Sequence, residues 1–177
     1  MKVRAVLEVK DMDIFQFAME KEKFSEDYYR QLAEKTEHKG LKNIFNMLAG
    51  EESKHYKIVE QMSRNIAPKV IETPILGNAK EIFEKMRESA EKFSLDISEL
   101  ELYQKARDIE KESRRFYLEK SQQVEDACQK EIFKKLANEE QKHLVLLEKI
   151  CDFVARPAWF LENAEMYRFD DYVDGVL

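Results

Sequence analysis

The chain has 177 residues, 44% of them hydrophobic and 37% charged, and its formal net charge is −6 with acidic and basic residues interspersed. This pattern excludes a basic surface stripe for nucleic acid, a membrane span of about 20 apolar residues, and a secretory signal at the amino terminus. We therefore expect one domain over residues 1–177 in a cytoplasmic protein, with no nucleic-acid or membrane partner.

Two amphipathic helices are predicted first, and the presence of only four glycines and three prolines is typical of an all-α fold. The first helix follows Asp11 and Asp13, which are candidate caps, and the second follows a turn at residues 36–40. Their inner faces are apolar with polar exceptions: Phe15, Ala18, Glu22, Ser25, Tyr29 and Leu32, then Leu41, Phe45, Leu48, Glu52, His55, Val59 and Met62. Because the turn is short, we expect an antiparallel hairpin over residues of about 12–63.

A long connection over residues of about 64–97 follows. Pro68, Pro74 and Gly77 predict a loop over residues 65–78, and the pattern from Ala79 to Phe93 predicts a small helix. Roughly thirty residues suffice to return along the ~40 Å length of a bundle. One long crossover is the connectivity of a ferritin-like four-helix bundle.

The second hairpin is predicted over residues of about 98–151. Ser98 and Glu101 resemble a capping box for its first helix, and a polar turn at Glu125 and Asp126 precedes its second. The inner faces carry Leu102, Ala106, Glu110, Ser113 and Tyr117, then Phe133, Leu136, Glu140, His143, Leu147 and Ile150. The only cysteines are Cys128 and Cys151, and they would lie roughly 35 Å apart on one helix, which excludes a disulfide between them.

The segment from Ala155 to Leu177 is rich in aromatic residues, namely Trp159, Phe160, Tyr167, Phe169 and Tyr172. We expect it to form an extra helix or arm. Its favoured role is to cover the surface of the bundle, in preference to binding a partner.

An internal repeat relates the two hairpins. A shift of 88 residues superposes many identical residues, among them Glu22 on Glu110, Glu52 on Glu140 and His55 on His143. Two such hairpins pack with approximate two-fold symmetry, so the repeated polar groups should meet on the axis.

The repeated groups form two ExxH pairs and two further glutamates. A Glu and a His three residues apart share one helix face and chelate a metal, and four carboxylates with two imidazoles are the donor set of di-iron carboxylate bundles. Four negative charges balance two divalent cations, whereas without metal the carboxylates would repel one another and take up protons. The predicted metal ligands are Glu22, Glu52, His55, Glu110, Glu140 and His143.

Other polar residues near the predicted ligands are expected not to bind metal directly. Four glutamates lie about 100–200° around the helix from the inner stripe and are predicted to face solvent: Glu20, Glu51, Glu112 and Glu139. His38 is predicted to be an ordinary surface histidine. Tyr29 and Tyr117 are candidates to donate a hydrogen bond to a ligating carboxylate, and a role as plain core tyrosines stays open.

The segments AMEKEKFSEDYYRQLA and ARDIEKESRRFYLEK, each followed by an EExKH helix, resemble the rubrerythrin branch of the ferritin-like superfamily over roughly residues 11–152. The resemblance implies a non-haem di-iron centre that reacts with hydrogen peroxide or oxygen. In it Glu52 and Glu140 bridge the irons, while Glu22 with His55 and Glu110 with His143 bind one iron each.

The chain departs from that family in two places. Two isolated cysteines cannot build the four-cysteine rubredoxin module, so a separate protein must donate electrons. Ser113 replaces an additional family glutamate and matches Ser25 in the other half, which makes the six-residue set symmetric.

The leading functional expectation is a di-iron oxidoreductase that acts on peroxide or oxygen as a homodimer or small homo-oligomer. The alternative is an iron-binding or ferroxidase protein of iron storage, which should form a hollow shell. A metal-stabilised interaction module and a hydroxylase are further readings. Manganese or zinc would also suit these donors.

Overall fold

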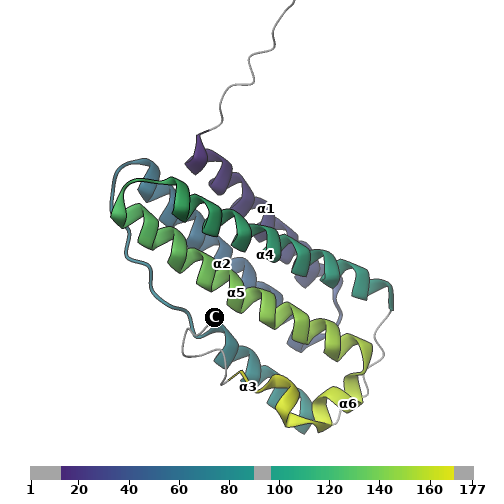
Figure 1. Ribbon diagram of the computed structural model, residues 1–177. Coiled ribbons are helices and arrows are strands. Elements are labelled where there is room, and N and C mark those ends of the chain that lie inside the picture. Colours follow the sequence, from purple (N-terminus) through teal and green to yellow (C-terminus); the bar gives the residue numbers. More distant parts are fainter. Residues whose placement is uncertain (1–12, 90–96, 170–177) are drawn as a thin grey trace, which may run out of the picture.

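The computed structural model describes residues 13–89 and 97–169, and all regular structure within these ranges is helical. Four long helices form the bundle: α1 (Ile14–Lys35), α2 (Lys39–Ser63), α4 (Ile97–Gln123) and α5 (Ala127–Ala155) (Figure 1). Helix α1 packs mainly on α2, and α4 packs mainly on α5. The expected all-α, ferritin-like bundle of two hairpins is confirmed.

The crossover between α2 and α4 contains α3 (Ile75–Glu88), which packs on α2 and α5 (Figure 1). The predicted start of this helix at Ala79 was wrong, because α3 begins directly after Pro74 and buries Ile75 and Leu76. A proline at a helix start removes no hydrogen bond. Residues 90–93 of the predicted helix lie outside the described ranges, and α4 begins at Ile97, one residue before the predicted cap.

Side-chain caps fix the starts of three long helices. Asp13, a candidate cap in the sequence, accepts a hydrogen bond from the amide of Phe15 at 3.4 Å. Asp126, in the predicted polar turn, accepts one from the amide of Gln129 at 2.7 Å. His38 caps α2 by accepting a hydrogen bond at Nδ1 from the amide of Leu41 at 3.3 Å. The prediction of a surface histidine was wrong, since His38 is partly buried and its ring packs edge-on against an aromatic ring of α5.

The buried interior consists of two apolar clusters with a polar layer between them. One cluster includes Leu48, Leu147 and Phe153 at the end covered by α3, and the other includes Met62 and Phe133 at the opposite end. A hydrophobic interior divided in this way means that the polar layer is shielded from water along the bundle axis.

The carboxyl-terminal segment continues into α6 (Pro157–Glu162) and the short 3-10 helix η1 (Ala164–Tyr167). Phe160, Tyr167 and Phe169 are buried there against α3 and α5, so this part covers the end of the bundle as expected, while Tyr172 lies outside the described residues. Both cysteines of α5 are free thiols. Within residues 13–89 and 97–169, no helix has the length and apolar character needed to cross a lipid bilayer.

Candidate metal centre

Six polar side chains meet in the layer between the two apolar clusters, and none is more than 2% exposed: Glu22, Glu52, His55, Glu110, Glu140 and His143. Their potential ligand atoms form two groups of four, in each of which all atoms lie within 4.8 Å of one another. The first group is Glu22, Glu52, His55 and Glu140, and the second is Glu52, Glu110, Glu140 and His143. Glu52 and Glu140 belong to both groups, so the two groups have two carboxylates in common.

Each histidine faces the shared glutamate of the opposite hairpin. Nδ1 of His55 lies 3.2 Å from Oε1 of Glu140, and Nδ1 of His143 lies 2.8 Å from Oε1 of Glu52. The two rings stack with centroids 5.4 Å apart and planes 14° apart. The two hairpins therefore interlock through this layer.

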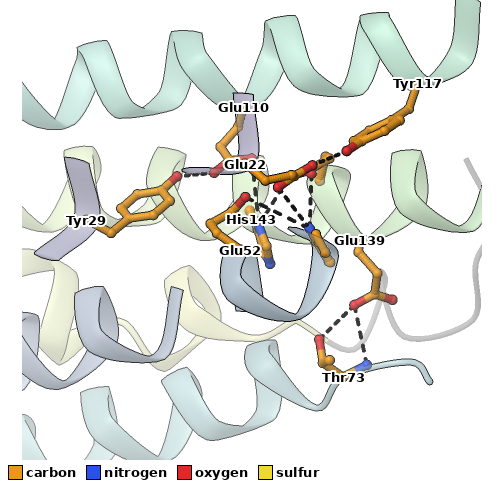
Figure 2. A network of polar contacts seen from close by, with 10 residues as sticks. Glu22, Tyr29, Glu52, Thr73, Glu110, Tyr117, Glu139 and His143 are labelled. Atoms are coloured by element: carbon orange, nitrogen blue, oxygen red, sulfur yellow. Dashed lines mark hydrogen bonds and ion pairs between the residues drawn. The ribbon is translucent and has the colours of Figure 1, made fainter. Parts of the chain in front are cut away.

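Two tyrosines hold the outer carboxylates from opposite sides of the layer (Figure 2). The hydroxyl of Tyr29 donates to Glu110, and the hydroxyl of Tyr117 donates to Glu22, so each tyrosine reaches a carboxylate of the other hairpin. Both hydrogen bonds that the sequence suggested are present. A contribution of these tyrosines to metal binding stays a prediction.

Burial and mutual repulsion shift the acidities in this layer. Burial and the neighbouring Glu140 raise the pKa of Glu110 to about 8, and the same causes raise the pKa of Glu52 well above its usual range. Burial opposes ionisation of Glu140 as well, but the adjacent imidazoles outweigh it and hold the pKa of Glu140 well below its usual range. Burial disfavours charged His55 and His143, yet the facing carboxylates raise the pKa of both. The metal-free layer therefore retains protons.

The donor set fits bound cations. Among the described residues, four carboxylate oxygens of this layer are buried with no hydrogen-bond partner, one each from Glu22, Glu52, Glu110 and Glu140. The 2.8 Å contact of His143 with Glu52 also lacks hydrogen-bond geometry at both atoms. Buried polar atoms normally have partners, and cations that suit oxygen and nitrogen donors would supply them here.

The prediction that four neighbouring glutamates face solvent was right for two and wrong for two. Glu20 and Glu112 are exposed, but Glu51 and Glu139 are 9% and 2% exposed. The crossover covers this face, and Thr73 donates to Glu139 through its hydroxyl at 2.7 Å and its amide at 3.3 Å (Figure 2). The internal repeat indicated that these two glutamates differ from Glu20 and Glu112, because the 88-residue shift also superposes Glu51 on Glu139.

A family model described as rubrerythrin matches residues 13–151, a range that includes both hairpins, the crossover and all six central residues. The chain belongs to the rubrerythrin family. A search of curated proteins and a search of solved structures found no match. For a rubrerythrin-family chain, the buried cluster of glutamates and histidines is compatible with a di-iron site.

Proposed function

We propose that the protein is a di-iron carboxylate oxidoreductase that reduces hydrogen peroxide or oxygen with electrons from a separate donor protein. The supporting observation is that two four-residue groups share Glu52 and Glu140. Glu22 and His55 would complete one metal position, and Glu110 and His143 the other. A bound iron pair would supply two electrons to the oxidant by passing from the diferrous to the diferric state.

The protein's own residues prepare this site. The four carboxylates offset the charge of two divalent cations, and the protons held by the metal-free layer leave when metal binds. Tyr29 and Tyr117 fix the orientation of the two outer carboxylates by hydrogen bonds. The apolar clusters above and below keep water away from the layer, which limits side reactions.

The test is anaerobic loading of metal-free protein with ferrous iron, followed by stopped-flow mixing with hydrogen peroxide or with oxygen. We expect about two irons per chain, as in other di-iron carboxylate bundles, and much faster oxidation by peroxide. Fewer irons would refute the proposal. Glu20→Ala is the matched control, because Glu20 is exposed and should leave the iron content unchanged.

The same experiment distinguishes an iron-storage protein from the proposed oxidoreductase. Equal rates with both oxidants, continued iron uptake and a large shell in size-exclusion chromatography would favour storage over the oxidoreductase. We propose a homodimer or small homo-oligomer in the cytoplasm.

A further inference from the structure

One of the two buried imidazoles of the polar layer also lines a surface pocket. The pocket has a volume of about 250 Å³ and lies between α2 and the crossover, which leaves α2 after Ser63 and runs along the bundle to α3 (Figure 1). Nδ1 of His55 faces Glu140 in the layer at 3.2 Å, while Nε2 is buried and has no hydrogen-bond partner among the described residues. The ring of His55 therefore separates the pocket from the polar layer.

The internal repeat shows that the two sides of the layer are covered differently. The 88-residue shift superposes Lys57 of α2 on Val145 of α5. Lys57 is exposed, whereas Val145 is 2% exposed and belongs to the apolar cluster that includes Phe83 of α3. The crossover and α3 thus cover α5 at this level, and the surface of α2 over His55 stays open.

The open surface is basic. Three lysines and two glutamates line the pocket: Lys54, Lys57, Lys69, Glu51 and Glu139. Both glutamates are buried and paired, Glu51 with Lys54 at 2.8 Å and Glu139 with Lys142 at 2.7 Å. Lys57 and Lys69 are exposed and have no carboxylate partner in the part of the chain that the structure describes. A chain with a net charge of −6 therefore presents two unpaired positive charges here.

Exposed apolar side chains accompany these lysines. Ile71 of the crossover lines the pocket and is 69% exposed. Ile66 is 53% exposed, and its amide donates a hydrogen bond at 2.9 Å to the carbonyl of Gln61, which also lines the pocket. Apolar contacts with a charged rim are the anatomy of a protein interface, and transient electron-transfer complexes need less than about 1,200 Å² of buried area in total. We call the surface formed by Lys54, Lys57, Lys69, Ile66 and Ile71 the basic patch.

We infer that the basic patch docks the separate electron donor, an acidic protein with a one-electron redox group, and this inference rests on the proposed function. Unpaired lysines steer an acidic partner to this face, and Ile66 and Ile71 supply apolar contact once it is docked. Docking here places the redox group over His55. Two encounters each oxidise one donor molecule by one electron, and the two electrons return a bound ferric pair to the ferrous state.

Binding is measured first, without turnover. The full chain is loaded with zinc, which keeps its oxidation state, and is titrated with oxidised flavodoxin, a small acidic electron carrier, while amide NMR shifts are recorded. The test variant is the double charge reversal Lys57→Glu with Lys69→Glu. The matched control is Lys130→Glu with Lys134→Glu, which changes the net charge equally at a pocket between α4 and α5. In the wild type, shifts should map to the basic patch and weaken as salt screens the charges.

Electron transfer is measured next, on iron-loaded and oxidised protein mixed anaerobically with reduced flavodoxin. At low salt, the Lys57 and Lys69 double variant should react about tenfold more slowly or worse, because removing electrostatic steering lowers association rates by such factors. The control variant should match the wild type, and the difference should shrink at high salt. Reduced methyl viologen, a small cation that needs no docking surface, should react no more slowly with the test variant than with the wild type.

Several outcomes would overturn the inference while the proposed function stands. These are no salt-dependent binding by the wild type, shifts that map to α1 and α4, an equal loss in the control variant, or an unchanged flavodoxin rate in the test variant. Phosphate alone reproducing the shifts, with that rate unchanged, would assign the patch to a small anion instead. Failure of the wild type to hold two irons, or to be reduced by methyl viologen, would remove the proposed function as well.

Ile71→Ser is a second variant that keeps every charge of the basic patch. Because Ile71 is largely exposed, the substitution should not disturb the fold. We expect severalfold weaker flavodoxin binding with the same salt dependence as the wild type. An unchanged affinity would contradict the apolar contact that the docking requires.

Discussion

Replacing Thr73 by Val should loosen the crossover from α5 without touching the six candidate metal ligands. The lost contact is the 2.7 Å hydrogen bond from the Thr73 hydroxyl to Oε2 of Glu139. Glu139 is only 2% exposed, so water replaces the hydroxyl poorly, and a charge-assisted hydrogen bond of this kind contributes about 1.5–3 kcal/mol. For a chain of this size, the melting temperature should fall by about 3–12 °C.

Unfolding of the metal-free protein by heat and by urea, followed by circular dichroism, measures this change. Thr73→Ser keeps the hydroxyl and is the matched control. Glu139→Gln and the double variant complete a double-mutant cycle, in which we expect a coupling of about 1 kcal/mol or more. Strictly additive effects, or a Thr73→Val protein as stable as the wild type, would refute this role of the contact.

Three further predictions concern the buried polar layer of glutamates and histidines. Glu52→Ala should lose more metal than Glu22→Ala, because Glu52 belongs to both four-residue groups and Glu22 to only one. Elemental analysis of the loaded proteins measures the metal content, and equal losses in the two variants would contradict this prediction. The metal-free protein should lose stability as pH rises between about 4.5 and 8. The pKa of Glu110 is raised to about 8 in the folded protein, so Glu110 keeps a proton there that the unfolded chain releases. The pKa of Glu140 is lowered on folding, so Glu140 changes the stability only below this pH range. Melting curves at pH 5 and pH 8, with and without zinc, check this, and a melting temperature that rises with pH in the metal-free state would contradict it. Tyr29→Phe removes the hydrogen bond to Glu110 and should weaken zinc binding about tenfold, as measured by competition with a chelator. An unchanged zinc affinity would show that the Tyr29 hydroxyl does not support metal binding.

The helical hairpins and the position of the polar layer could be predicted because they depend on local periodicity. A helix period of 3.6 residues places Glu22 and Ser25 on the inner face, and the structure buries both. The 88-residue repeat then fixes depth, since residues related by it lie at the same level of the two hairpins. Asp13 could be recognised as a cap because a cap acts on its own helix.

The path of the crossover could not be predicted, because no periodic pattern encodes it. Glu51 and Glu139 are one position away from the predicted ligands, and helix geometry alone turns them outward. They become buried only because residues distant in sequence, such as Thr73, cross that face of the bundle. The early start of α3 has a similar origin, since Ile75 and Leu76 are held by tertiary packing despite Gly77 beside them.

Neither hairpin by itself contains a complete four-residue group of candidate metal ligands. Each four-residue group takes three members from one hairpin and one from the other, and each tyrosine crosses to the opposite half. A single ancestral hairpin that associated with its own copy would have built the same layer, and duplication with fusion through the crossover would make that association permanent. Two separately expressed halves of this chain would accordingly be expected to find each other most readily when a divalent cation is present.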